Sequence, residues 1–330
     1  MIRVDVARML EIIREEGPAS VSLNGPDGML TAVQEAAVRI SGEAGIPAYV
    51  IADTTWGSCD LNEAGARAIG ADIHFNIGHT INVERLGSTY MIDAFDDVRF
   101  DRVAAECAAR LAGRRAVLVT DSQHLREIGR VREILGEGGV DVAVGPGGGQ
   151  LNDGQVFGCE FYPATDAAGG ADACVFMGQS GFHAAGVALA TGLPTYALDP
   201  YFGEVRDVSG LADRIQRRAT LAAAKAAEAS SFGIIVGLRD GQTSKVSALR
   251  MKKELEAAGR RVQMFAMTDI TNERLRNLSG IEAFIQSACP RISTDNSFDM
   301  PVLSMPQARA MLEIIRGREA GPYLRARHWL

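Results

Sequence analysis

The sequence predicts an α/β protein made of three similar small domains, each a parallel sheet flanked by helices. Short apolar runs rich in Val, Ile and Phe alternate with amphipathic helical runs along the chain, which is typical of parallel strands joined by crossover helices. The plan restarts near residues 116 and 232, and 330 residues are enough for two or three domains. The predicted domains are 1–112, 113–230 and 231–330.

The first predicted domain begins with a helix and continues as a β-α-β-α-β unit. Residues 1–17 have charged side chains at helical spacing, which favours an amphipathic helix over a signal peptide. Gly45 then ends a second helical run, as glycine commonly does at a helix C-terminus. The expected strands are 19–25, 47–55 and 71–80, the last of which closes the unit, and the expected helices are 1–17, 27–45 and 61–70.

The second predicted domain repeats this alternation around a long glycine-rich loop. The expected strands are 116–122, 140–145, 172–178 and 193–200, and the expected helices are 125–139, 181–192 and 209–230. The glycine-rich loop, 145–159, follows the second of these strands. The alanine-rich helix 209–230 has strong helix propensity, and we expect it to bridge the second and third domains.

The third predicted domain follows the same plan and ends with a helix. The expected strands begin at 232, 261, 281 and 302, and the helices between and after them cover 245–259, 272–280 and the end of 302–317. Three units of one plan indicate a Rossmann-like triplication. In open parallel sheets of this kind, ligands bind at the carboxyl ends of the strands.

Composition excludes several classes of function. The 35.2 kDa chain is 47% hydrophobic and 23% charged, which is ordinary for a soluble enzyme. A net charge of −7 and a pI near 5.4 argue against a nucleic-acid binder, and no apolar run reaches the length of a membrane helix. Five cysteines, an odd number with wide spacing, do not suggest a disulfide framework. We therefore expect a reducing, cytoplasmic location.

Three of the five cysteines lie in turns that follow predicted strands, one in each domain. They are Cys59 in TTWGSCD, Cys159 in VFGCEF and Cys289 in QSACPRI. Cys59 and Cys159 follow the second strand of their domains, whereas Cys289 follows the third strand. All three cysteines therefore lie at the carboxyl edge of a sheet, although not after the same strand. Three thiolates that meet at one point can hold three irons of a cubane cluster and leave the fourth iron open.

The other two cysteines and the spacing of the first three narrow the inorganic alternatives. Cys107 lies in an alanine-rich amphipathic helix and Cys174 lies inside a strand, so we expect both to be buried core residues. Structural zinc sites usually contain local pairs of cysteines two to four residues apart, and this sequence has no such pair. A shared cluster therefore fits the pattern better than zinc.

Motifs spread from about residue 24 to 295 resemble those of the diphthamide synthase family, the archaeal 2-(3-amino-3-carboxypropyl)histidine synthases. The matching segments are IADTTWGSCD, GADIHFNIGHT, GPDGML, VFGCEF, VFMGQSGFHAAGVAL, GLRDGQ and SACPRISTD. DTTWGSC and ACPRIS are specific in combination, whereas GLRDGQ alone is a weak signal. The resemblance covers nearly the whole chain.

The resemblance implies a 4Fe–4S cluster held by Cys59, Cys159 and Cys289 in a homodimer. It also implies radical chemistry on S-adenosyl-L-methionine without the CxxxCxxC loop of other radical enzymes, and the sequence lacks that loop. The family transfers the 3-amino-3-carboxypropyl group of this substrate to the imidazole C2 of a histidine on translation elongation factor 2. This is the first step of diphthamide biosynthesis, and it needs an electron donor as a further partner.

Three residues are candidates for binding S-adenosyl-L-methionine. Arg291 lies two residues after Cys289 and can clamp the methionine carboxylate, or form an ordinary salt bridge. The turn at Gly181 begins a helix, so its backbone N–H groups can receive a carboxylate or an adenosine hydroxyl, or serve the turn alone. Gln242 stands at a strand end of the third domain, where it binds the cofactor or caps the next helix.

Three further residues are candidates for catalysis. His79 and His183 lie near strand or helix ends that face the same predicted cleft, where they contact substrate or cofactor, or act as structural histidines. Asp295 can orient the incoming imidazole by accepting its N–H, with helix capping as the competing role.

Two other functions are compatible with a cluster held by three domains. Quinolinate synthase also gathers three cysteines from three similar domains, and its open iron acts as a Lewis acid in a dehydration. The local motifs match that family less well. The chain can also be a non-catalytic iron–sulfur partner subunit, although it contains all three candidate ligands.

Overall fold

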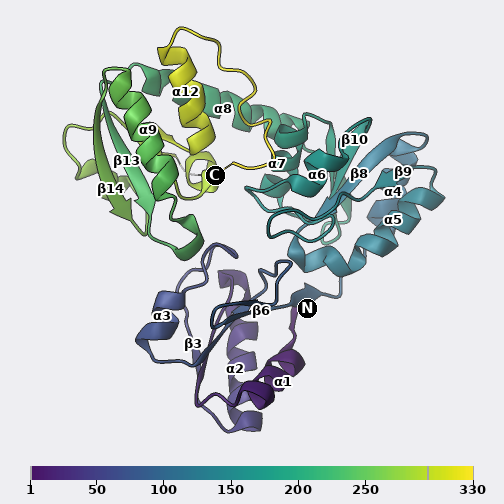
Figure 1. Ribbon diagram of the computed structural model, residues 1–330. Coiled ribbons are helices and arrows are strands. Elements are labelled where there is room, and N and C mark those ends of the chain that lie inside the picture. Colours follow the sequence, from purple (N-terminus) through teal and green to yellow (C-terminus); the bar gives the residue numbers. More distant parts are fainter. Residues whose placement is uncertain (1, 296, 330) are drawn as a thin grey trace.

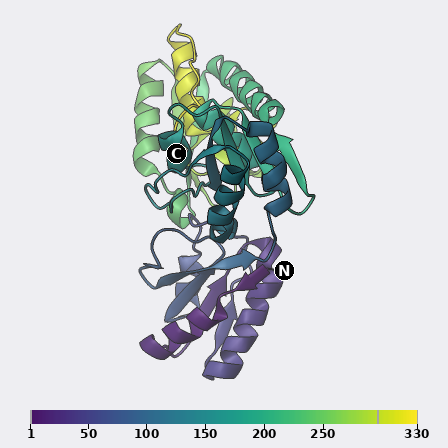
Figure 2. The same ribbon diagram turned by 90° about the vertical axis from the view of Figure 1, so that its right-hand side faces the viewer.

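The structure, a computed structural model, describes residues 2–295 and 297–329. Its described residues form three mainly parallel sheets flanked by helices, which confirms the predicted α/β fold. Each sheet and its helices make one lobe, and the three lobes lie around a common centre (Figure 1). Figure 2 shows the first lobe below the other two after a quarter turn. Among the described residues, no helix combines the length and the apolar character that a bilayer-spanning segment needs.

The first lobe contains a five-stranded sheet with helices packed against it, and a short pair formed by its first and last strands. Its elements are β1 (Ile2–Val4), α1 (Val6–Glu16), β2 (Val21–Asn24), η1 (Asp27–Met29), α2 (Leu30–Ala44), β3 (Ala48–Val50), α3 (Glu63–Ala68), β4 (Ile73–Ile77), β5 (Arg85–Leu86), β6 (Thr89–Ile92) and β7 (Ala94–Asp96). The strand order is β3-β2-β4-β6-β5, and only β5 is antiparallel to its neighbour. Helices α1 and α2 share one apolar core with the sheet. Both helices end at a glycine with positive φ, Gly17 and Gly45.

The second lobe repeats this arrangement and has helices on both faces of its sheet. Its elements are α4 (Asp101–Leu111), β8 (Arg115–Thr120), η2 (Ser122–Glu127), α5 (Ile128–Glu137), β9 (Asp141–Ala143), α6 (Tyr162–Ala167), β10 (Ala173–Met177), α7 (Gly181–Thr191), β11 (Thr195–Asp199), β12 (Glu204–Asp207) and α8 (Ser209–Ala227). The strand order is β12-β11-β10-β8-β9, with β12 antiparallel at the edge. One apolar core holds α4 and α5, and the other holds α6 and α7.

The third lobe has a fully parallel sheet in the order β14-β13-β15-β16. Its elements are β13 (Ser231–Gly237), η3 (Asp240–Gln242), α9 (Lys245–Ala257), β14 (Arg261–Met267), α10 (Asn272–Arg276), β15 (Ala283–Gln286), α11 (Pro290–Asp295), β16 (Val302–Leu303) and α12 (Met305–Ile315). In all three lobes the first four parallel strands therefore lie in the same order: second, first, third, fourth. This order places a topological switch point, where ligands bind in such sheets, between the first and third strands.

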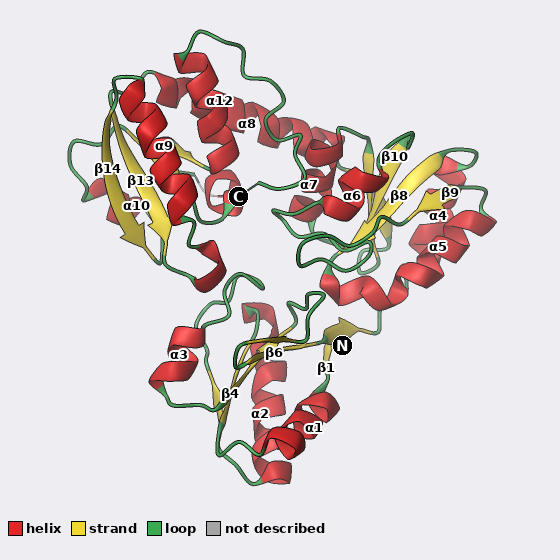
Figure 3. Cartoon of the chain, viewed as in Figure 1, coloured by secondary structure: helices red, strands yellow, loops and turns green. Residues whose placement is uncertain are grey.

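Two segments connect the second and third lobes (Figure 3). Helix α8 contributes Ala212 and Ala219 to a core of the second lobe and Ala223 and Ala226 to the core of the third, which confirms the predicted bridging helix. After α12 the chain returns to the second lobe, where the buried Trp329 packs on Phe161. The tail therefore contacts both lobes.

Several expectations differ from the structure because tertiary contacts override local patterns. The predicted helix 1–17, whose first residue lies outside the described residues, is instead β1 followed by α1, because β1 pairs with β7. Strand β4 does not close its sheet, since β6 and β5 extend it. Elements α6, α11 and β12 were not expected.

The packing also bears on the domain boundaries. Helix α4 precedes the predicted boundary at residue 112, yet its buried residues belong to the core of the second sheet. The C-terminal tail lies within the predicted third domain, 231–330, yet it completes a core of the second lobe. These contacts favour a boundary before α4 and a tail shared between lobes.

Replacing Trp329 by Ala should lower the free energy of unfolding of the second lobe. The side chain is 1% exposed, and its indole N–H donates to the Leu324 carbonyl at 2.9 Å. Removing a buried tryptophan typically costs about 3–5 kcal/mol. Urea unfolding measures the loss, with Val246→Ala, at a 74% exposed position on α9, as the control. Equal midpoints for the two variants would contradict the packing of the tail.

Candidate functional site

Loops at the carboxyl ends of the strands contact one another between the lobes. The Ser122 hydroxyl, after β8, donates to the Gly78 carbonyl, after β4, at 3.1 Å. The Arg291 guanidinium, in the third lobe, lies 4.8 Å from the centre of the Phe182 ring of the second lobe. The first and third lobes meet through Arg239, as described below. The three ligand-binding edges therefore face a shared centre, where the ribbons of all three lobes converge in Figure 1.

The structure brings Cys59, Cys159 and Cys289 to this centre, where all three are half-buried. Burial raises the pKa of each thiol, that of Cys289 to about 11. The negative charges of Cys289 and Cys59 raise the pKa of Cys159 further, and Cys59 does the same to Cys289. Such mutual repulsion requires the three sulfur atoms to lie near one another.

The surroundings of Cys59 come from the third lobe. The Gln242 side chain donates to the Cys59 Sγ at 3.4 Å, and the Gly241 N–H donates to the Cys59 carbonyl at 2.8 Å. A Cβ at Gly241 would lie 2.7 Å from the Cys59 Cα, so only glycine permits this approach. The predicted site residue Gln242 is thus in direct contact with a candidate ligand.

Cys159 and Cys289 are held through their backbones. The Trp329 N–H donates to the Cys159 carbonyl at 2.9 Å, so the C-terminal tail supports this turn. A Cβ at the preceding Gly158 would lie 2.4 Å from the Phe182 ring. The Cys289 carbonyl accepts from the Gln286 side chain at 2.8 Å, and Pro290 begins α11 directly after it.

The donor set fits a cluster better than a single metal ion. Among the described residues no group of three His, Cys, Asp or Glu side chains is arranged to hold one ion. Three cysteines from separate lobes can act as the thiolate ligands of a cubane, whose positive irons would offset the repulsion between the ionised sulfurs. Cys107 and Cys174 are buried in the second-lobe cores, as predicted.

His79 and His183 are half-buried and face the same region. Burial lowers the pKa of each to about 4, and His79 and Arg291 contribute to the lowering at His183. His79 Nδ1 is buried without a hydrogen-bond partner in the described structure, whereas His183 Nδ1 lies 2.6 Å from the Ser180 hydroxyl. Both imidazoles are therefore neutral at pH 7.

The remaining predicted residues lie around α7 and α11. Gly181 is the first residue of α7, and Ser180 caps that helix. The Arg291 Nε donates to Asp295 Oδ2 at 2.7 Å, and Asp295 Oδ1 accepts from the Thr294 hydroxyl. Both oxygens of Asp295 are thus engaged within α11, so its contacts favour positioning Arg291 over the predicted orientation of an imidazole.

Sequence reasoning missed the ion pair that joins the first and third lobes. Arg239 Nη1 lies 2.7 Å from Asp60 Oδ2, and Arg239 Nη2 lies 2.8 Å from Asp269 Oδ1. Arg239 and Asp60 are 14% and 5% exposed. Asp60 follows Cys59 directly, so this pair fixes the turn that carries a candidate ligand. In the sequence, the only signal for Asp60 is its position directly after Cys59.

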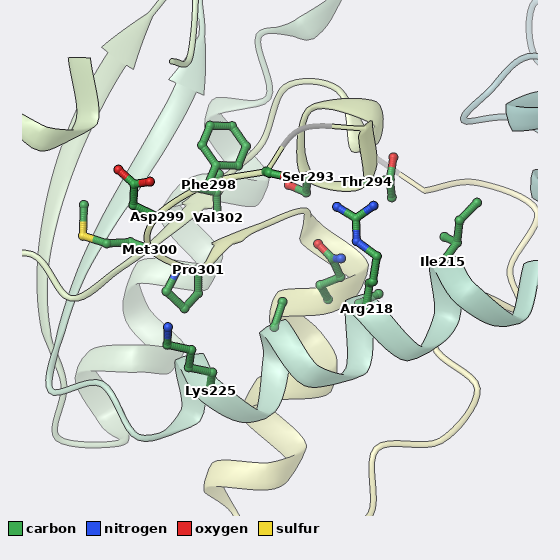
Figure 4. A pocket seen from close by; sticks show the side chains of 14 residues that line it. Ile215, Arg218, Lys225, Ser293, Thr294, Phe298, Asp299, Met300, Pro301 and Val302 are labelled. Atoms are coloured by element: carbon green, nitrogen blue, oxygen red, sulfur yellow. The ribbon is translucent and has the colours of Figure 1, made fainter. Parts of the chain in front are cut away.

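A cavity of about 260 Å³ lies apart from the thiols, between α8 and residues 293–302. Arg218 and Lys225 line it from α8, and Thr294 and Asp299 line it from the opposite segment (Figure 4). None of the three cysteines contributes to its wall. The candidate site is therefore the strand-end centre and not this cavity.

Comparison with known proteins agrees with this geometry. Residues 25–323 match the family described as "Putative diphthamide synthesis protein". The chain belongs to this family. It is 27% identical to the 2-(3-amino-3-carboxypropyl)histidine synthase of Pyrococcus horikoshii, over 93% of this chain and 89% of the relative. It is also 27% identical to 2-(3-amino-3-carboxypropyl)histidine synthase subunit 1 of Gallus gallus, over 96% of this chain and 78% of the relative.

This chain also resembles solved structures along nearly its full length. The crystal structure of Dph2 from Pyrococcus horikoshii with a 4Fe–4S cluster matches with a TM-score of 0.87 and 26% identity, covering 97% of this chain and 94% of that one. A second crystal structure of the same Dph2 matches with a TM-score of 0.86. The fold of this chain is thus the fold of a protein crystallised with such a cluster.

Replacing Arg239 by Ala should destabilise the contact between the first and third lobes. The change leaves the carboxylate of Asp60 buried without its partner, which costs about 3–5 kcal/mol for such pairs. Arg276→Ala, which removes a pair with a 65% exposed arginine, is the control and should cost at most about 1 kcal/mol. Urea unfolding of both variants measures the difference, and equal losses would mean that the Arg239 pair is not a structural tie.

Proposed function

We propose that this chain is an iron–sulfur transferase of diphthamide biosynthesis. It transfers the 3-amino-3-carboxypropyl group of S-adenosyl-L-methionine to a histidine imidazole C2 of translation elongation factor 2. The observation that carries the proposal is the convergence of one strand-end thiol from each lobe, evident from the mutual effect of their charges. Membership of the family and the similarity to a cluster-containing Dph2 support it.

Cys59, Cys159 and Cys289 would hold the 4Fe–4S cluster. When bound, a cluster with three protein ligands supplies an electron and an open coordination position. The protein contributes the surroundings: Gln242 donates a hydrogen bond to the Cys59 sulfur, and hydrogen bonds to cluster sulfurs adjust the reduction potential. Gly241 and Gly158 allow the loops to approach this closely.

The side chains around the thiols suit a substrate that carries a sulfonium cation. Neutral His79 and His183 do not repel this cation, because burial holds the pKa of each near 4. His79 Nδ1 lacks a partner in the described residues and can bond to substrate. Arg291, held by Asp295 and stacked on Phe182, can bind the methionine carboxylate through its remaining N–H groups.

The N-terminus of α7 offers a second polar contact for this substrate. Gly181 begins the helix beside His183, and backbone N–H groups at a helix N-terminus bind carboxylates or hydroxyls. A Cβ at Gly181 would meet Leu211 at 3.2 Å, so a larger residue would push on α8. We assign Gly181 to substrate binding through its backbone.

The proposal includes partners and a location. The substrate protein is elongation factor 2, the enzyme acts as a homodimer, and a separate donor reduces the cluster. Because the thiols must stay available to iron, we place the protein in the reducing cytoplasm.

Each of the three cysteines should be needed for iron. After anaerobic reconstitution we expect about four irons per chain in the natural protein, and loss of most of that iron in Cys59→Ala, Cys159→Ala and Cys289→Ala. Cys107→Ala, in the core of the second lobe, is the matched control and should retain its iron. Iron and sulfide counts with visible absorption measure the result. Full iron in any of the three variants would remove that cysteine from the ligand set.

The small-molecule product tests the reaction itself. Reduced, reconstituted protein with S-adenosyl-L-methionine and elongation factor 2 should yield 5′-methylthioadenosine and a histidine that carries the aminocarboxypropyl group, because the bond from sulfur to the γ-carbon breaks. Mass spectrometry detects both. Formation of 5′-deoxyadenosine instead would contradict the proposed bond cleavage.

The same preparation separates the alternatives. Quinolinate formed from dihydroxyacetone phosphate and iminoaspartate would indicate a quinolinate synthase-like dehydratase. Iron loading without any cleavage of S-adenosyl-L-methionine would indicate a non-catalytic partner subunit.

A further inference from the structure

Asp121 occupies the switch point of the second sheet. It directly follows β8, the first strand of that sheet, and neighbours Gly178, which directly follows β10, the third strand. A Cβ at Gly178 would lie 3.3 Å from Asp121 Oδ2, so the carboxylate lies against the turn that leads to His183. Ligands of open parallel sheets bind at this position.

Contacts of the neighbouring residues place Asp121 beside the candidate site. Ser122 bonds to Gly78, which precedes His79. On its other side, the Thr120 carbonyl accepts from the Val156 N–H at 2.8 Å, three residues before Cys159. Asp121 therefore lies between the loop that carries an unpartnered histidine and the loop that carries a candidate cluster ligand.

The carboxylate of Asp121 has no cationic partner among the described residues. Oδ1 accepts from the Gln123 N–H at 3.1 Å, and no side chain donates to Oδ2. Burial raises the pKa of Asp121 to about 7, and the backbone N–H groups of Gln123 and His124 offset only part of this effect. By contrast Asp199, the last residue of β11 in the same sheet, has the Arg206 guanidinium at 3.3 Å.

A substrate cation would supply this missing charge. S-adenosyl-L-methionine carries an ammonium group and a carboxylate on one carbon, and the two need opposite partners. Arg291, which contacts Phe182, and Asp121, which contacts Gly178, stand at the two ends of the same turn. The neutral His79 and His183 offer no charge to either group.

We propose that Asp121 binds the α-ammonium group of S-adenosyl-L-methionine and, with Arg291, fixes the orientation of its amino-acid end. This inference rests on the proposed function and adds a binding residue to it. Charge-assisted hydrogen bonds are the stronger class, so the contact should matter for affinity and for the placement of the γ-carbon.

The test compares Asp121→Asn with the natural protein, both reconstituted anaerobically. Asparagine keeps an oxygen to accept from the Gln123 N–H, so the helix cap survives while the charge is lost. We expect unchanged iron content and about ten- to a hundred-fold weaker binding of S-adenosylhomocysteine and S-adenosyl-L-methionine by calorimetry. Binding of the S-adenosylhomocysteine analogue that lacks the α-amino group should not change.

Asp5→Asn is the matched control, because Asp5 caps α1 in the same way, in a different lobe. It should leave all three affinities unchanged. Equal affinities in Asp121→Asn and the natural protein, or an equal loss for the analogue without an amino group, would overturn the inference. A loss for S-adenosyl-L-methionine alone would also overturn it, because the sulfonium would then be the contact. If the natural protein binds neither ligand, the proposed function fails together with this inference.

Discussion

The site depends on three thiols that the fold brings together, although their ionised forms would repel one another. Burial and mutual repulsion both disfavour the thiolate forms of Cys159 and Cys289. Such an arrangement is stable only if the surrounding lobes hold it or a positively charged group offsets it. Burial therefore keeps these thiols protonated, and a positively charged group would be needed to hold them as thiolates.

The lobes are held around this centre by contacts that do not belong to any single sheet. Arg239 ties the first lobe to the third beside Cys59, α8 joins two cores, and the tail residue Trp329 supports Cys159. Because every lobe uses the same strand order, each presents a switch point to the centre. Repetition of one simple unit thus produces a composite site that no unit forms alone.

Charge is distributed unevenly around the thiols, and this fits the cationic substrate of the proposed reaction. The histidines are neutral because they are buried. The positive charge of Arg291 is kept near Asp295, and the carboxylate of Asp121 has no cationic partner in the described chain. A site with separate positive and negative side chains favours an amino-acid group over a simple anion or cation.

The sequence by itself determined the three α/β units, the bridging helix and the placement of one cysteine in a turn after a strand of each unit. These features are local, because strand and helix periods and turn residues are properties of neighbouring positions. Only the tertiary structure decided that α4 and Trp329 belong to the second lobe and that Arg239 pairs with Asp60, 179 residues away. Contacts between such distant residues leave no periodic trace in the sequence. They form when the sheets pack against one another, because packing brings buried apolar faces and oppositely charged side chains into contact.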